Sequence, residues 1–109
     1  MKISVRDVGV AKVVEVEGDV DLGTSPDLRR TLFDALPTVA RLALNLGAIR
    51  YIDSSGIATL IEVLKHSQAL KKEFVLFGLS PAVLEVFRLT HVIRIFQVFQ
   101  TEQEALGTS

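Results

Sequence analysis

The chain has 109 residues, of which 49% are hydrophobic and none is cysteine. This is the size of one ordinary domain, and we expect a single domain over residues 1–109. Lys and Arg total 12 against 13 Asp and Glu, so the net charge is −1. Proteins that bind nucleic acid usually carry a basic surface, so no nucleic-acid partner is expected. The lack of cysteine excludes disulfides and Cys-based zinc sites.

The sequence also gives no sign of a membrane segment. A spanning helix needs roughly 18 apolar residues, whereas the longest uncharged stretch, residues 74–84, is short and contains glycine, serine and proline. Lys2, Arg6 and Asp7 interrupt the N-terminal region, where a secretory signal would be apolar. We therefore expect a cytoplasmic protein that does not bind membranes.

The first third of the chain predicts a hairpin followed by a helix. Residues 3–16 are rich in β-branched side chains that partly alternate with charged ones, and Gly9 is a candidate for the turn between two strands. The segment 24–27 then combines a hydroxyl cap, a proline and an acid, which is typical of a helix N-terminus. Apolar residues at helical spacing continue this amphipathic helix to Leu36.

The middle of the chain predicts a strand and a second helix. Residues 41–46 are almost all apolar, as in a buried strand. From Ile57 onward an apolar stripe recurs at helical spacing, which predicts a helix that ends near Lys71.

The last third continues the alternation. Residues 74–77 form a short apolar run typical of a central strand, and Ser80-Pro81 opens a third helix. A last strand is predicted at residues 95–99, and Thr101 with Glu104 resembles a capping box for a final short turn. Alternating strands and helices require crossover connections. We therefore predict an α/β fold with a mixed, mostly parallel β-sheet, an N-terminal antiparallel hairpin and about four helices.

The common catalytic signatures are missing. The sequence has no phosphate-binding loop, dinucleotide fingerprint, zinc-protease motif or hydrolase nucleophile elbow. We expect no cofactor, no metal site, no small-molecule substrate and no enzymatic activity. The alternative from another functional class is a small hydrolase that pairs Ser54 or Ser55 with His66 or His91.

The distinctive segment is Asp53-Ser54-Ser55-Gly56, where an apolar strand region passes into a helix. Small polar residues there leave the first helical N–H groups accessible at the positive end of the helix dipole, which favours a phosphate. Asp and Ser are also the preferred N-cap residues. Taken alone, the segment is better explained as a helix cap.

Five segments occur in one order along the chain: Gly18-Asp19-Val20-Asp21-Leu22, Leu44-Asn45-Leu46, Tyr51-Ile52-Asp53-Ser54-Ser55-Gly56, Gly78-Leu79-Ser80-Pro81 and Thr101-Glu102-Gln103-Glu104-Ala105-Leu106. Together they resemble the STAS domain, specifically the bacterial anti-sigma factor antagonists. The resemblance covers essentially the whole chain, from about Val5 to Leu106.

This resemblance implies a partner-switching protein. Unphosphorylated family members bind an anti-sigma factor that is also a serine kinase, and thereby release a sigma factor for transcription. The kinase phosphorylates the first serine of the motif, which is Ser54 here, and a metal-dependent serine phosphatase reverses the modification. The added charge should be tolerated at a helix N-terminus, so we expect the fold to survive and the partner interface to be lost.

The resemblance also assigns the neighbouring residues. Asp53 matches the acid of the motif, and Ser55 stands at a position that shapes the turn or, as the less favoured option, accepts phosphate itself. Gly56 would let a partner backbone come close. The Gly-x-x-Asp-Leu region adds Asp21 and, with less weight, Asp19, although such acids also cap turns. The expected partner-binding residues are Asp21, Asp53, Ser54, Ser55 and Gly56.

A second interpretation stays within the same fold. The chain could instead be a STAS scaffold or accessory subunit of a stress-signalling assembly or a lipid-transport ATPase complex. In that case Ser54 would be structural. The sequence alone leaves both interpretations open.

Overall fold

The computed structural model describes residues 1–107 and contains a five-stranded sheet in the order β1-β2-β3-β4-β5. The strands are β1 (Lys2–Val8), β2 (Ala11–Val20), β3 (Arg41–Ile52), β4 (Glu73–Phe77) and β5 (Gln97–Phe99). β1 pairs with β2 in antiparallel fashion, and the other neighbours are parallel. Gly9 lies in the turn between β1 and β2 with a φ of 62°. The predicted mixed sheet and its hairpin are confirmed.

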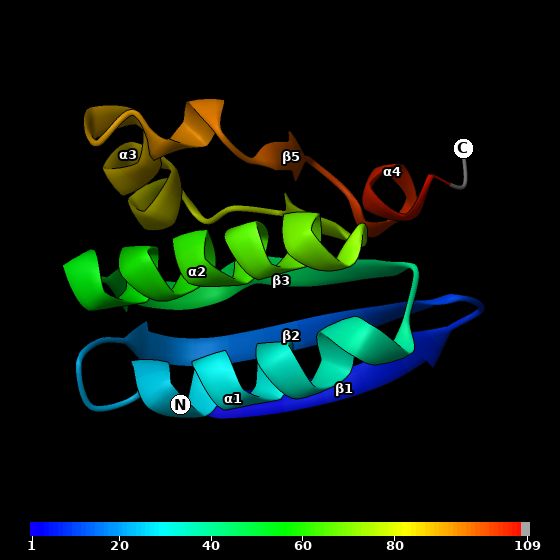
Figure 1. Cartoon of the computed structure of the whole chain (residues 1–109). Coiled ribbons are helices and arrows are strands. Elements are labelled where there is room, and N and C mark those ends of the chain that lie inside the picture. Colours follow the sequence, from blue (N-terminus) through cyan, green and yellow to red (C-terminus); the bar gives the residue numbers. More distant parts are fainter. Residues whose placement is uncertain (108–109) are drawn as a thin grey trace.

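The helices are α1 (Ser25–Ala35), α2 (Ser54–Leu70), α3 (Pro81–Leu89) and α4 (Glu102–Leu106), with short 3₁₀ turns η1 (Leu36–Thr38) and η2 (Val92–Arg94). Figure 1 shows α1 and α2 next to each other across one face of the sheet. α4 covers part of the opposite face. Within residues 1–107, no helix has the length and apolar character needed to cross a bilayer.

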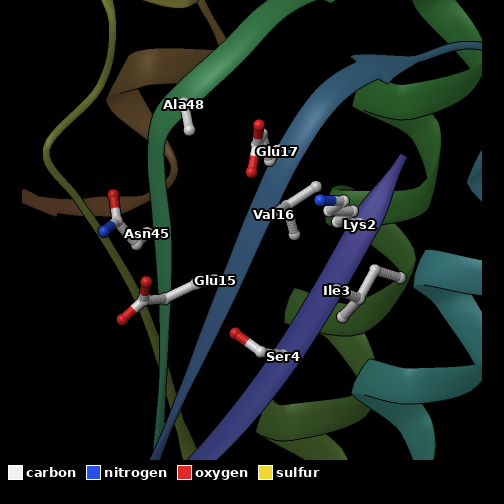
Figure 2. A pocket seen from close by; sticks show the side chains of 8 residues that line it. All are labelled: Lys2, Ile3, Ser4, Glu15, Val16, Glu17, Asn45 and Ala48. Atoms are coloured by element: carbon white, nitrogen blue, oxygen red, sulfur yellow. The ribbon is translucent and has the colours of Figure 1, made fainter.

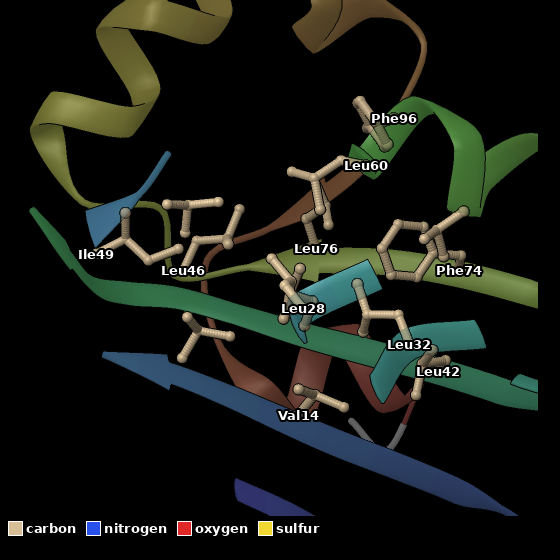
Figure 3. Close-up of a cluster of buried hydrophobic side chains, with 14 of the residues drawn as sticks. Val14, Leu28, Leu32, Leu42, Leu46, Ile49, Leu60, Phe74, Leu76 and Phe96 are labelled. Atoms are coloured by element: carbon tan, nitrogen blue, oxygen red, sulfur yellow. The ribbon is translucent and has the colours of Figure 1, made fainter. Parts of the chain in front are cut away.

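The main core lies between the sheet and helices α1 to α3. Alternation along β3 and β4 points Leu42, Leu46 and Leu76 toward the helices, where they meet Leu28 and Leu60 (Figure 3). Side chains that alternate to the other face of the sheet, Val13, Ala43, Val75 and Phe77, form a smaller cluster under Ala105 of α4. Both faces of the central strands are therefore buried.

α4 covers only part of the sheet face opposite α1 and α2. The uncovered part is hollowed and lined mainly by polar side chains. Figure 2 shows Glu15, Glu17 and Asn45 on this hollow of about 420 Å³. Arg6 donates hydrogen bonds to Glu15 and to Glu102 of α4, so it joins the hairpin to the last helix. Because these side chains are polar, this part of the sheet needs no further cover.

Two element boundaries and one helix cap differ from the sequence prediction. β3 runs to Ile52 and not only to Leu46, because pairing with β2 continues through a stretch in which only Ile49 and Ile52 are buried. The last strand begins at Gln97, and Ile95 before it is exposed. The hydroxyl of Thr24 does not cap α1: it donates to the carbonyl of Asp19 at 2.8 Å.

The predicted helix ends otherwise agree with the structure. Ser80 caps α3 by accepting a hydrogen bond from the Val83 N–H. Thr101 and Glu104 form a complete capping box at the start of α4. α2 ends at Leu70, followed by Lys71 in a left-handed conformation.

Candidate functional site

Asp53 joins the end of β3 to the start of α2. Its backbone N–H donates to the carbonyl of Val20 at 3.2 Å, which holds this junction against the end of β2. Its carboxylate oxygen Oδ1 accepts from the N–H groups of Ser55 at 2.9 Å and Gly56 at 3.2 Å. Two of the helix's free N–H groups are thereby satisfied. Asp53 is the N-cap of α2.

The hydroxyl of Ser55 is committed to the same turn, because it donates to Asp53 Oδ1 at 2.5 Å. This hydrogen bond, with smaller contributions from the N–H groups of Gly56, Ser55 and Leu22, holds the pKa of Asp53 below its ordinary value. Asp53 is therefore ionised at neutral pH, and its charge is used to order the turn. Ser55 shapes that turn, which is the favoured of its two expected roles.

Ser54 differs from both of its neighbours. It is the first residue of α2, and its side chain is exposed. Within residues 1–107 its hydroxyl makes no hydrogen bond. The turn thus holds a free hydroxyl on the surface, at the positive end of the helix dipole of a 17-residue helix.

Gly56 packs against the ends of β2 and β3. It is buried, and a Cβ added there would lie 2.7 Å from Cγ1 of Ile52 and 2.8 Å from Cγ1 of Val20. Real Cβ atoms do not approach carbon atoms so closely, so the missing side chain makes room for the ends of β2 and β3. Its smallness serves packing within the fold, and the close approach of a partner backbone at this residue stays a prediction.

The loop after β2 lies beside this turn. Asp21 Oδ1 accepts from the N–H groups of Gly23 at 3.0 Å and Thr24 at 3.1 Å, so its carboxylate orders the loop before α1. The neighbouring Leu22 side chain is 78% exposed, and its backbone N–H helps to lower the pKa of Asp53. Tyr51, just before the turn, is 53% exposed. Two large apolar side chains, in the segments that flank the turn, are therefore exposed.

The family model of the STAS domain matches residues 2–105. The chain belongs to the STAS domain family.

Relatives of this STAS chain have names that concern sigma-factor regulation. It is 27% identical over 96 residues to an anti-sigma-B factor antagonist of Listeria monocytogenes, covering 86% of this chain and 83% of the relative. An anti-sigma factor antagonist from Mycobacterium paratuberculosis has a similar structure, with a TM-score of 0.87 at 23% identity over 97% of this chain and 91% of the other. This structural similarity supports the fold.

A further solved structure is that of the Bacillus cell fate determinant SpoIIAA. Its phosphorylated form superposes with a TM-score of 0.75 at 20% identity and covers 97% of both chains. Its unphosphorylated form has a TM-score of 0.81 at 21% identity, covering 96% of this chain and 93% of the other. The STAS fold predicted from the sequence motifs is confirmed.

Other residues singled out in the STAS sequence are distributed as follows. Asp19 forms a loose ion pair with Arg50, 3.7 Å between Oδ1 and Nε, on an exposed surface where such pairs contribute little. Ser25 is buried as the first residue of α1. Asp19 is therefore paired and Ser25 is buried, whereas the hydroxyl of Ser54 is both exposed and without a hydrogen bond within residues 1–107.

Neither histidine is hydrogen-bonded to Ser54 or Ser55 within the described residues. His66 lies on α2 itself, about 18 Å along the helix axis from Ser54 at 1.5 Å per residue. Its ring stacks on Phe33 of α1, with 4.6 Å between centroids. His91 follows α3 in a left-handed conformation. Among the described residues, no three His, Cys, Asp or Glu side chains come together as metal ligands.

Sequence reasoning missed Leu22 and Tyr51 as surface residues of this site. The only available signal was their position, since Leu22 ends the Gly-x-x-Asp-Leu segment and Tyr51 begins the segment with the two serines. Apolar side chains at those places are ordinarily assigned to the core. Their exposure depends on how the two strand ends lie side by side.

Proposed function

We propose that this STAS chain is an anti-sigma factor antagonist switched by phosphorylation of Ser54. Its unphosphorylated form binds an anti-sigma factor that is also a serine kinase, and the bound sigma factor is released. Phosphorylation of Ser54 ends that complex, and a metal-dependent serine phosphatase restores it. The names of its relatives support the general role. These partners act in the cytoplasm, where we place the protein.

The observation that carries the proposal is the contrast between two adjacent hydroxyls. Ser55 donates to Asp53 at 2.5 Å and is tied into the turn. Ser54 is exposed and has no hydrogen-bond partner within residues 1–107. A kinase can therefore reach the Ser54 hydroxyl without breaking the cap of α2, whereas phosphorylation of Ser55 would break it.

Electrostatics explains why the modification would act on the interface and leave the fold intact. A phosphoserine carries about −1.5 to −2 charge at neutral pH, which the N-terminus of a helix accommodates. The N–H groups of Ser55 and Gly56 are already bonded to Asp53, so the phosphate would project toward solvent beside a like charge. No bond of the native turn has to be given up.

The surface around Ser54 suits a protein partner. The exposed side chains of Leu22 and Tyr51 offer apolar area, while Asp53 contributes charge next to the hydroxyl. A partner that covers these side chains would desolvate the Ser54 hydroxyl at small cost. It could not desolvate a phosphate dianion without supplying a matching cation. We expect phosphorylation to abolish this complex.

The decisive experiment is intact-mass analysis after incubation with ATP and each anti-sigma kinase candidate from the same genome. We expect one addition of about 80 Da, the mass of a phosphoryl group. The addition should be lost in Ser54→Ala and kept in Ser55→Ala. Circular dichroism of Ser55→Ala serves as the folding control, because that variant loses the hydrogen bond to Asp53.

Two results would contradict the proposal. An addition that disappears only in Ser55→Ala would move the acceptor to the second serine. The absence of any addition in the folded wild-type protein with every candidate kinase would favour the accessory-subunit function. In that case Asp53-Ser54-Ser55-Gly56 would act only as the start of α2.

A further inference from the structure

A groove of about 450 Å³ lies between α3 and the carboxyl ends of β4 and β5, apart from the Ser54 turn. Four of its lining side chains are apolar: Leu79, Leu84, Val98 and Phe99. Arg88 also lines it. The carboxyl ends of parallel strands are the edge at which open α/β sheets bind their ligands. The volume is within the range of small-molecule sites.

The walls of the groove are fixed by backbone contacts. Gly78 has a φ of +66°, and its N–H donates to the carbonyl of Phe99 at 3.0 Å, which ties the loop after β4 to the end of β5. The Ser80 hydroxyl donates to the carbonyl of Ile49 at 2.9 Å and accepts from Val83 N–H, which anchors the start of α3. The groove is therefore formed before any ligand binds.

The guanidinium of Arg88, like that of Arg94, has no carboxylate partner within residues 1–107, and of these two arginines only Arg88 lines the groove. Arg6, Arg29, Arg30, Arg41 and Arg50 all have a carboxylate partner. Arg88 has none within residues 1–107 and is exposed. It lies four residues after Leu84 on α3, so the two side chains share one face of the helix. A free cation thus borders the apolar wall.

Glu104, which is hydrogen-bonded at the edge of the groove, does not form an ion pair with Arg88. Glu104 Oε1 accepts from the N–H groups of Gln100 and Thr101, both at 3.2 Å, and completes the capping box of α4. Gln100, which follows β5, supplies a polar edge to the groove. The chemistry offered to a ligand is therefore an apolar floor, a polar edge and one unpaired guanidinium.

We propose that this groove binds an amphipathic carboxylate, an acyl chain of medium length. Its carboxylate accepts two hydrogen bonds from the guanidinium of Arg88. Its hydrocarbon tail lies against Leu84, Leu79 and Phe99. A polyphosphate ligand fits less well, since a single arginine lines the groove and the Gly78 N–H is already bonded to Phe99. This site is independent of the phosphorylation proposed at Ser54.

The test is a titration of the ¹⁵N-labelled full chain with sodium octanoate below its micelle concentration, followed by NMR. We expect saturable shifts at the amides of Leu79, Leu84 and Phe99. Arg88→Gln should weaken binding about tenfold, the loss expected for a charge-assisted pair. The matched control is Arg94→Gln, since Arg94 in η2 is exposed, has no ion pair among residues 1–107 and does not line the groove.

A neutral analogue separates charge recognition from simple apolar adsorption. We expect 1-octanol to bind more weakly than octanoate and to be insensitive to Arg88→Gln. Equal binding of both compounds, or equal affinity of the wild type and Arg88→Gln, would overturn the role of Arg88. Absence of shifts at millimolar octanoate would overturn the site. So would shifts spread over exposed apolar residues elsewhere, such as Leu22.

A third ligand tests whether the groove instead serves a protein partner. We would titrate a short peptide that combines leucines with a glutamate under the same conditions. Binding of the peptide in the groove without binding of octanoate would contradict the acyl-chain proposal and assign the groove to a protein segment. Leu84→Gln should weaken octanoate binding by removing apolar wall, and retained affinity in that variant would also count against the proposal.

Discussion

α2 and α3 are both capped at the N-terminus by a side chain, but the two capped turns differ in whether they leave a free hydroxyl. Each helix follows a strand, and each has an N-cap side chain that accepts from backbone N–H groups of the first turn. At α3 the cap is Ser80, whose hydroxyl is fully used between Val83 N–H and the Ile49 carbonyl. At α2 the cap is Asp53, which leaves the next residue, Ser54, with a free hydroxyl.

The residue that follows each N-cap also differs between the two helices. α3 has Pro81 there, with no hydroxyl to modify, whereas α2 has Ser54. Two positions further on, α3 has the buried Val83 and α2 has Gly56, where no Cβ fits. A serine at the N-cap position, such as Ser80, is thus engaged within the fold. A serine one position after the N-cap, such as Ser54, keeps a hydroxyl that can be modified.

The strongest test of this comparison is Gly56→Ala. The added Cβ would lie 2.7 Å from Ile52 and 2.8 Å from Val20, so we expect a loss of about 1–3 kcal/mol in urea unfolding from overpacking. The control is Gly23→Ala, whose Cβ would be 3.5 Å from Asp21 Oδ1. A gain of about 1 kcal/mol in Gly56→Ala, as helix propensity alone would give, would show that α2 does not pack as closely as described.

A smaller effect is expected from Ser80→Ala. That variant loses the N-cap bond to Val83 and leaves the Ile49 carbonyl without its donor, so the free energy of unfolding should fall by about 1 kcal/mol. Affinity for the partner should not change, since Ser80 is engaged within the fold. Partner binding measured by calorimetry and stability measured by denaturant give the two readouts. A loss of affinity without a loss of stability would assign Ser80 to the interface.

Ser54→Ala should change the free energy of unfolding by less than about 0.5 kcal/mol, because its hydroxyl is exposed and makes no hydrogen bond within residues 1–107. Ser54→Asp should likewise keep the circular dichroism spectrum of the wild type while it loses the partner. Unfolding of Ser54→Asp would refute an effect confined to the interface. A large destabilisation in Ser54→Ala would contradict the finding that the Ser54 hydroxyl makes no hydrogen bond.

The smallest predicted effect concerns acid. Asp53 has a pKa below its ordinary value in the folded state, so the unfolded chain binds its proton first. Its contribution to stability is therefore complete above the unfolded pKa of about 3.9 and is lost as the pH falls through the lower folded pKa. Asp53→Asn keeps an acceptor without this titration. The free energy of unfolding, measured between pH 7 and 3, should fall less steeply with acid in the variant than in the wild type. An identical fall in both proteins would contradict the lowered pKa of Asp53.

Much of the α2 start was predictable because its signals are local. Asp followed by two small polar residues is a preferred N-cap pattern, and the Thr101–Glu104 capping box could be inferred from spacing alone. These motifs depend on backbone N–H groups within one turn of the same residues. The sequence can therefore specify them without knowledge of distant contacts.

The second half of β3 was not predictable in the same way. Gly47, Ala48, Arg50 and Tyr51 are exposed, so no apolar run marks the strand. It persists because β2 pairs with it as far as Ile52. The same pairing brings Leu22 close to Asp53 and leaves its side chain on the surface. An apolar residue next to a loop acid gives no local sign that it will be exposed there.

The sequence by itself determined the order of strands and helices, the caps of α2, α3 and α4, and the motif that identifies the STAS family, because each follows from neighbouring residues. Only the tertiary structure decided that the Ser80 hydroxyl is bonded to the Ile49 carbonyl while the Ser54 hydroxyl is free. It also decided that Gly56 is a packing residue and that Arg88 borders an apolar groove. Each of these depends on side chains and backbone groups that meet across strands and helices, at distances that local sequence does not encode.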